Sequence, residues 1–244
     1  MKRTLFGLSA MVMSCFLMAA AKAPEREVKG NRLISRSAPA IEIQVPRSAV
    51  YLGAERWDLY DVADCELHLF VEAYPDKTVK AMYWIQFEAY LPTNEHTYDY
   101  SDDEPVTFGG RPFWKSSNFG PTNNTPRAGG DGERTRQMLA RAGYKLPAER
   151  MSVRLVHLLD ESRRKELMVI YAEDLATSGY TAAQLLDGKE PRPEWKAVGQ
   201  GLVERAMKRI KLNPKSSSVQ SRSSGATQRL SPSLHLARLP APIR

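Results

Sequence analysis

Apolar and polar residues alternate with a period of two through most of the chain between residues 41 and 91, which is typical of β-strands. The segments concerned are rich in aromatic and β-branched residues and read, in order, IEIQV, AVYLG, WDLYDV, CELHLFVEA and VKAMYWIQFEAYL. One face of the last segment is apolar, whereas the other combines Trp84 with the polar Gln86 and Glu88. This pattern predicts an antiparallel strand with one face in the core and the other in water.

A further pair of strands is predicted over residues 151–175, where two apolar runs flank a charged turn. If residues 162–164 form the loop, His157 faces Val169 across the hairpin. Both faces of this hairpin are apolar near its middle. We therefore expect it to lie inside the sheet, with a helix over one side.

Two helices are predicted on the C-terminal side of these first strands. Apolar residues at i, i+3, i+4 and i+7 indicate an amphipathic helix over PEWKAVGQGLVERAMKRIKL, with Pro193 in its first turn. A shorter helix is predicted over 133–142, with Asp131 as its N-cap and Gly143 as its end. The order of elements favours the α+β class: a curved, mostly antiparallel β-sheet packed against a C-terminal amphipathic helix and one shorter helix.

The domain organisation follows from where this periodicity begins and ends. Residues 22–40 have no sustained period and are predicted to be an extended lead-in, and residues 41–212 to be a single α+β domain. Residues 92–132 are rich in Gly, Pro and Asn and are predicted to be mainly irregular, with a short strand near 106–108. Residues 213–244 are rich in Ser and Arg without apolar periodicity, which predicts a disordered tail.

The N-terminus has the pattern of a secretory signal peptide over residues 1–21, with Lys2 and Arg3 before an apolar run and small residues at its end. Export to the periplasm or the medium is the interpretation we favour. Two alternatives stay open, an uncleaved anchor and a lipoprotein attached through Cys15, and the first of these requires a run of about 17 apolar residues. Membrane contact is expected only through such an uncleaved or lipidated N-terminus.

The distribution of charge argues against nucleic-acid binding. The formal net charge is +7, but residues 1–23 and 214–244 contribute cations and no acids, which leaves the body of the chain close to neutral. Without a basic face or a recognisable motif, we expect no DNA or RNA partner.

Two histidines are the candidates for acid–base chemistry. His96 lies in the stretch EHTYDYSDDEP, which has one histidine among many carboxylates and lacks the spacing of zinc or calcium sites. We therefore predict a solvated connection there and no metal ion. His68 lies between Glu66 and Glu72 on one strand face and is a weak candidate for a general base. The alternative that we favour is a polar residue on the wet side of the sheet.

Aromatic residues in FGGRPFWKSSNFGP form the most suggestive cluster for binding. They are compatible with a contact surface on a loop or with a plug that closes the open end of the sheet. On the first interpretation, the candidate ligand-binding residues are Trp84, Arg111, Phe113 and Trp114.

The sequence contains no G-x-S-x-G, H-E-x-x-H, P-loop, dinucleotide-binding or C-x-x-C motif, and we predict no cofactor. We therefore expect an exported, non-enzymatic envelope protein that binds a small apolar ligand or a protein partner. The alternative is a periplasmic hydrolase-like enzyme that uses His68 or His96 with neighbouring carboxylates.

Overall fold

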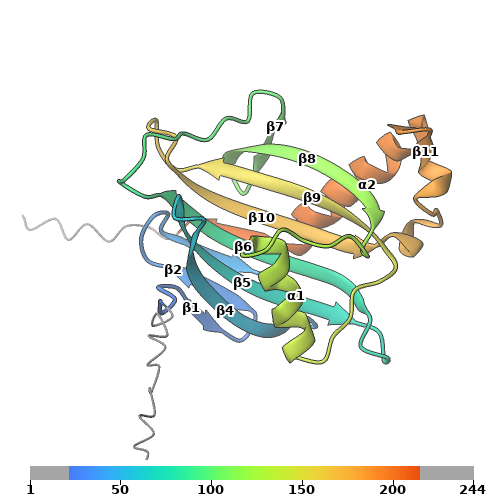
Figure 1. The fold of residues 1–244 in the computed structure, drawn as a ribbon, viewed down its shortest axis with the longest axis horizontal. Helices are drawn as coiled ribbons and strands as arrows, with labels where there is room; N and C mark the ends of the chain where they lie inside the picture. Colours follow the sequence, from blue (N-terminus) through green and yellow to red (C-terminus); the bar gives the residue numbers. More distant parts are fainter. Residues whose placement is uncertain (1–21, 215–244) are drawn as a thin grey trace, which may run out of the picture.

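A computed structural model describes residues 22–214 of the chain. These residues form a large and a small antiparallel sheet, a two-stranded ribbon and two α-helices (Figure 1). The strands of the large sheet, in spatial order, are β4 (Val50–Leu59), β5 (Ala63–Ala73), β6 (Val79–Tyr90), β10 (Lys165–Asp174), β9 (Glu149–Leu158), β8 (Arg111–Pro121) and β7 (Glu104–Phe108). The small sheet contains β1 (Glu27–Lys29), β2 (Arg32–Ser35), β3 (Ile41–Gln44) and β13 (Lys211–Pro214).

Apart from the shorter of the two α-helices, the remaining elements connect β10 to β13. Two short 3₁₀ turns span Leu175–Ser178 and Ala183–Leu185, and the ribbon pairs β11 (Leu186–Asp187) with β12 (Glu190–Pro191). The long helix α2 (Pro193–Arg209) follows the ribbon, whereas the shorter α1 (Asp131–Arg141) lies between β8 and β9 in the sequence. The predicted α+β class, with a mostly antiparallel sheet and a C-terminal helix, is confirmed.

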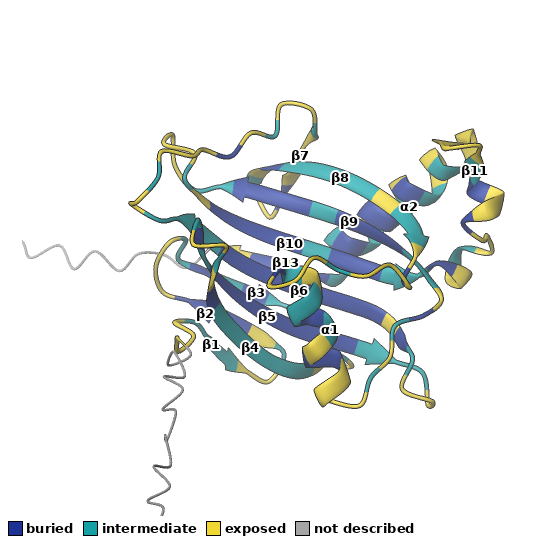
Figure 2. Ribbon diagram, in the orientation of Figure 1, coloured by how far each residue is buried: buried dark blue, intermediate teal, exposed yellow. Residues whose placement is uncertain are grey.

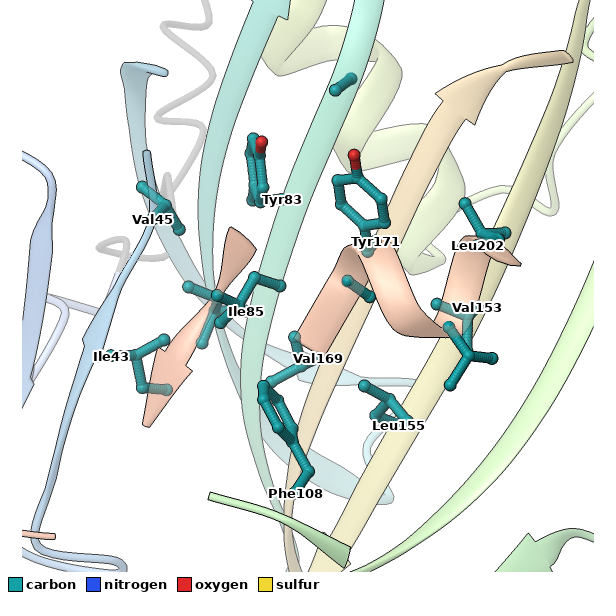
Figure 3. Packing of buried hydrophobic residues seen from close by; sticks show 14 of the residues in the cluster. Ile43, Val45, Tyr83, Ile85, Phe108, Val153, Leu155, Val169, Tyr171 and Leu202 are labelled. Atoms are coloured by element: carbon teal, nitrogen blue, oxygen red, sulfur yellow. The ribbon is translucent and has the colours of Figure 1, made fainter. Parts of the chain in front are cut away.

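The back face of the large sheet, which we define as the face opposite α1, carries the main core. Odd-numbered residues of β6, β9 and β10 point toward this face, because side chains alternate along a strand. They pack against β3 and against α2, as Figure 3 shows for Ile43, Ile85, Val153, Val169 and Leu202. The small sheet and α2 therefore form the second layer.

The front face carries α1. Met138 and Leu139 of the helix pack over β4, β5 and β6, where Trp57 and Leu69 belong to the same buried cluster. The segment that follows β8 crosses the front of the sheet before α1 begins (Figure 1). α1 does not cover the part of the front face that β8, β9 and β10 form (Figure 2).

The front face of β6 differs from the prediction of a wet surface. Met82 and Trp84 are buried, and Gln86 is fully buried. The reason is that α1 and the segments beside it cover this part of the sheet. Alternation alone cannot show this cover, because a half-polar face is compatible with water and with a second layer.

Residues 27–35, predicted to be part of an extended lead-in, form the hairpin of β1 and β2 instead. Leu33 in this hairpin is fully buried. The folded domain therefore begins before residue 41. Short strands of three and four residues have too few alternating positions to be recognised as periodic.

The segment 92–132 is more regular than predicted. The expected strand near 106–108 is part of β7, but the aromatic stretch that follows forms the eleven-residue strand β8 rather than a loop. Gly109 and Gly110 make the tight turn between the two strands, with φ values of 56° and 74°. The turn joins β7 and β8 into a hairpin, which the sequence did not predict because its glycines indicated an irregular segment.

The β9–β10 hairpin lies inside the sheet, as predicted, but in another register. His157 faces Leu167 rather than Val169, so its partner is shifted by two residues. The loop is longer than expected, because Leu159 is the last residue that bonds across the hairpin, to Lys165. A shift of two residues keeps each side chain on its predicted face.

Both predicted helices are present. Pro193 is at the first position of α2. Gly130 rather than Asp131 is the N-cap of α1, so this helix begins at Asp131, one residue earlier than predicted. Within residues 22–214, no helix is long and apolar enough to cross a membrane. The predicted signal peptide, Cys15 and nearly all of the predicted disordered tail lie outside the described residues.

Candidate ligand-binding groove

A cavity of about 350 Å³ lies on the front face, at the boundary between the part of the sheet that α1 covers and the part that it leaves open. We call it the front groove. Its lining residues are Met82, Trp84, Ser116, Ser117, Asn118, Arg150, Ser152, Arg154 and Ile170. They come from β6, β8, β9 and β10, so only the assembled sheet brings them together.

The register of the sheet explains this combination. Trp84 pairs with Ile170, Ile170 with Arg154, and Arg154 with Ser116, which places one residue from each strand in a single row across the sheet. The neighbouring row contains Met82, Ala172, Ser152 and Asn118. Because residues in register share a face, an apolar side on β6 and β10 meets a polar side on β8 and β9.

Arg150 is the charged residue at one end of the groove. It is half-buried, and within residues 22–214 it forms no hydrogen bond or ion pair through its side chain. Burial, followed by the nearby Arg136, lowers the pKa of Arg150. A guanidinium that has lost part of its hydration without gaining a protein partner is a strong attractor for an anion.

Arg154 lies at the other end, four residues further along β9 and therefore about 13 Å away along the strand. Its guanidinium binds Asp103 at 2.9 Å and lies over the ring of Tyr100. Between the two arginines, Ser152 donates a hydrogen bond to the side-chain oxygen of Asn118 at 2.6 Å. Of the two cations, Arg150 is thus the one available to a ligand.

The apolar side of the groove is held rigidly. Trp84 is only 6% exposed, and its indole nitrogen donates to the side-chain oxygen of Gln86 at 2.9 Å. The Gln86 amide donates in turn to Glu88 at 2.8 Å. This chain of hydrogen bonds fixes the orientation of the indole ring, which a preformed binding site requires.

A group of carboxylates lies two rows away on the same face, beyond Gln86. Glu166 is 2% exposed and accepts a hydrogen bond from Tyr100 at 2.6 Å, and Glu88 accepts one from Tyr98 at 2.8 Å. Burial raises the pKa of Glu166 to about 8. Burial and then the neighbouring Glu88 raise the pKa of Asp131, the first residue of α1, to about 6.

These contacts revise the prediction for the stretch EHTYDYSDDEP. It is a connection between strands, but Tyr98 is 7% exposed rather than solvated, and its neighbour Tyr100 is partly buried. The backbone of the segment is also held by Arg163 and Arg164 from the β9–β10 loop. Within the described part of the chain, no group of acids, histidines and cysteines has metal-binding geometry.

His68 lies on the back face, and its surroundings correct the prediction of a residue on the wet side of the sheet. The ring is 1% exposed, with Nδ1 3.0 Å from the Tyr51 hydroxyl and Nε2 2.8 Å from Glu66. Both ring nitrogens are therefore engaged. The β1–β2 hairpin and its leading residues cover this position, which local sequence could not reveal.

His96 is exposed, and its ring lies beside that of Tyr90. His68 is on β5 and His96 is in the connection between β6 and β7, so the structure does not bring the two histidine candidates together. Neither of them lines the front groove.

Like the two histidines, the four predicted ligand-binding residues do not lie at one site. Trp84 lines the groove, whereas Phe113 is 1% exposed on the back face, in contact with the Phe108 ring. Trp114 is half-buried on the front face, in the row of Gln86, and Arg111 lies at the β7–β8 turn. Phe113 fits the second interpretation of the aromatic cluster, in which the rings close the end of the sheet as part of the core.

The residues that sequence reasoning missed are Asn118, Arg150, Ser152 and Arg154. Three of them stand at alternate positions of an otherwise apolar strand in ERMSVRLV. Polar residues at every second position of a central strand are a signal for a polar site on one face, provided that the strand is known to be central.

Comparisons with known proteins add no further constraint: no protein-family model matches the chain, and no curated protein or solved structure is similar to it.

Proposed function

We propose that this is an exported, non-enzymatic binding protein whose front groove holds a small organic anion with an apolar body. The observation that carries the proposal is Arg150, a half-buried guanidinium without a protein partner among residues 22–214, at the end of a preformed cavity. The ligand's carboxylate or phosphate would bind Arg150.

The apolar side of the groove supports this ligand class. Trp84, Met82 and Ile170 line the cavity, and each 100 Å² of apolar ligand surface that they cover contributes roughly 2.5 kcal/mol. The volume of about 350 Å³ is near the lower end for ligand sites, so the ligand is small. Ser152 and Asn118 supply hydrogen-bonding groups that fix its orientation.

The groove favours binding over catalysis. Its lining contains arginine, serine, asparagine and apolar side chains, but no histidine, cysteine or carboxylate. His68, one of the two histidine candidates of the alternative hydrolase hypothesis, has a hydrogen-bonding partner at each ring nitrogen and is 1% exposed.

Export is the second part of the proposal, and it rests on the sequence of residues 1–21. N-terminal sequencing of the protein isolated from the producing cells tests it. We expect a mature chain that begins near residue 22 in the periplasm or the medium, and a chain in the cytosol that begins at Met1 would contradict export.

Calorimetric titration of the purified protein with octanoate, octanol and octylamine tests the ligand class. These probes share an eight-carbon chain and differ in charge. We expect octanoate to bind most tightly, because only its carboxylate can pair with Arg150. Equal affinity for the three probes, or no binding of octanoate, would overturn the proposal.

Two matched variants locate the binding site. Arg150→Gln should weaken octanoate binding by about tenfold, since a charge-assisted hydrogen bond is lost. Arg36→Gln removes a cation whose side chain is 74% exposed, and it should leave the affinity unchanged. If both variants bind octanoate as the wild type does, the ligand is not held by Arg150.

A further inference from the structure

The outer edge of the large sheet is only partly closed. β7 pairs with β8 from Arg111 to Lys115, and β8 continues along β9 to Pro121. Residues 116–121 therefore have no strand on their outer side within the part of the chain that the structure describes. Such an open edge is a template for pairing with another strand.

The backbone groups that face outward can be assigned from the ladder. Thr122 N donates to Ala148 O at 3.0 Å, which makes this a hydrogen-bonded pair in register with β8 and β9. Because such pairs alternate, the even-numbered residues of β8 bond to β9, and the N–H and C=O groups of Ser117 and Phe119 point outward. Among residues 22–214, neither residue's backbone has a hydrogen-bond partner on that side.

A second groove, of about 430 Å³, runs between this open edge and α2 and shares only Ser116 and Ser117 with the front groove. We call it the edge groove. Ser117 lines it from the strand, and Trp195, Lys196, Gly199, Gln200 and Val203 line it from the helix. The Trp195 ring packs on Phe119 with a centroid distance of 4.4 Å and lies beside Gly199, where an added Cβ would be 3.5 Å from the indole ring.

The charges around the edge groove are mainly positive. Lys115, Arg192 and Lys196 line it with a single carboxylate, Glu104, which Lys115 already neutralises. Arg192 and Lys196 are exposed and, within the described residues, their side chains form no ion pair. An acidic occupant is therefore favoured electrostatically.

We propose that an extended acidic peptide segment of another protein adds to the outer edge of β8 as an antiparallel strand and fills the edge groove beside α2. Its backbone pairs with Ser117 and Phe119, and its alternate side chains contact Trp195 and the two exposed cations. A strand edge beside a helix is the arrangement that peptide-binding modules use for strand addition. The proposal does not depend on the ligand of the front groove.

Selection of random decapeptides displayed on phage against the full-length protein tests this proposal. We expect enriched peptides in which the alternate positions that face α2 carry apolar residues together with Asp or Glu. Binding of the labelled peptides is then measured by fluorescence anisotropy. Failure to enrich any peptide, or enrichment of basic peptides, would overturn the proposal.

Ser117→Pro is the decisive variant. It removes the outward N–H of Ser117 while sparing the bonds to β9, so the sheet should tolerate it as edge strands tolerate proline. We expect it to weaken peptide binding by about tenfold. Methylation of alternate backbone amides in the peptide should have the same effect, and this measurement needs no variant protein.

Lys196→Gln should weaken binding about threefold and reduce its dependence on salt, since one favourable charge is lost. Lys208→Gln, the same substitution at an exposed position near the other end of α2, is the control and should change neither quantity. Peptides that bind Ser117→Pro and Lys196→Gln as they bind the wild type would show that they bind elsewhere. Dimerisation of the wild type that Ser117→Pro abolishes would identify a second copy as the occupant instead.

Discussion

At the scale of single residues, the front face contains ionisable side chains that are held away from water without an opposite charge. Arg150 is half-buried without an ion pair in the described chain, and Glu166 is 2% exposed with only the Tyr100 hydroxyl as a hydrogen-bond donor. Such groups lower the stability of the folded state, because they lose hydration that the protein does not replace. Their presence is easier to understand at a binding site than in a purely structural sheet.

The first prediction concerns the stability of an Arg150→Met variant. Replacing the unpaired guanidinium by an apolar side chain of similar length should raise the free energy of unfolding by about 1 kcal/mol. Urea unfolding of the protein without ligand measures the change. Arg36→Met at an exposed position is the control, with an expected change within about 0.5 kcal/mol. A marked loss of stability in Arg150→Met would mean that the guanidinium has a structural partner.

The second prediction concerns the pH dependence of stability. The pKa of Glu166 is raised to about 8 in the folded state, whereas its value in the unfolded chain is near 4.5. Between pH 4.5 and pH 8 the folded protein therefore carries a proton on Glu166 that the unfolded chain has lost. Stability due to this group is therefore present below pH 4.5 and is lost as the pH rises toward 8. Asp131, with a pKa of about 6, acts in the same direction.

A Glu166→Gln variant isolates this effect, because glutamine has nearly the same shape and does not titrate. Its free energy of unfolding should fall less than that of the wild type between pH 5 and pH 8, with a difference on the order of 3 kcal/mol. The opposing influence of His157, whose pKa is lowered mainly by burial, is common to both proteins and cancels. Glu161→Gln in the exposed loop is the control. Parallel pH profiles for wild type and Glu166→Gln would contradict the prediction.

At the scale of elements, β8 is the strand on which both proposed sites depend. Ser116 and Ser117 line both grooves, and the outer edge of the strand is open after Lys115. The length of β7 determines where that edge begins. The Gly109–Gly110 turn fixes the pairing of the two strands, and therefore sets which residues of β8 remain unpaired.

The third prediction compares two glycines in these elements. Gly109→Ala should destabilise the protein by about 2 kcal/mol, because φ is +56° and the new Cβ would lie 2.6 Å from Leu212 Cβ. Gly199→Ala should be neutral or stabilising by up to about 1 kcal/mol, since its Cβ has only ordinary contacts in a helix. Thermal unfolding of the two variants measures both effects, and equal melting temperatures would contradict the prediction.

At the scale of the whole molecule, the two ends of the described chain form the layer behind the large sheet. β1, β2 and β3 come from one end and β13 from the other, and β13 pairs with β3. The backbone amides of Glu25 and Arg26 bind Glu66 on β5, and the Arg26 guanidinium binds it at 2.9 Å. Burial would raise the pKa of Glu66, but hydrogen bonds from His68, these amides and Arg26 lower it to about 2.

The fourth prediction tests this connection with Arg26→Gln. Removing the guanidinium leaves a carboxylate that is 1% exposed without its cation, which should reduce the free energy of unfolding by about 3 kcal/mol. Arg36→Gln, which breaks an exposed pair with Glu27, is the matched control with an expected loss below about 1 kcal/mol. Urea unfolding at pH 7 distinguishes the two. Similar small losses for both variants would indicate that the first residues are not required for stability.

The sequence by itself determined the type of most elements, because alternation and helical spacing are local properties. The strands that become β3, β5 and β6 and both helices follow from the residues within each segment, whereas β4 joins two segments, AVYLG and WDLYDV, that the sequence predicted separately. The hairpin of β9 and β10 was also predicted, and only its register was wrong. The short strands and β8 were missed, because glycines or small numbers of residues obscure the period there.

Only the tertiary structure decided which side chains share a site. Trp84 and Arg154 belong to one row because β10 lies between β6 and β9, an order that pairs segments far apart in the sequence. The environment of Glu66, the carboxylate that contacts His68, likewise includes residues 25–26, some forty positions away along the chain. Local periodicity specifies the face on which a residue lies, but burial and binding depend on what covers that face, and long-range pairing supplies that cover.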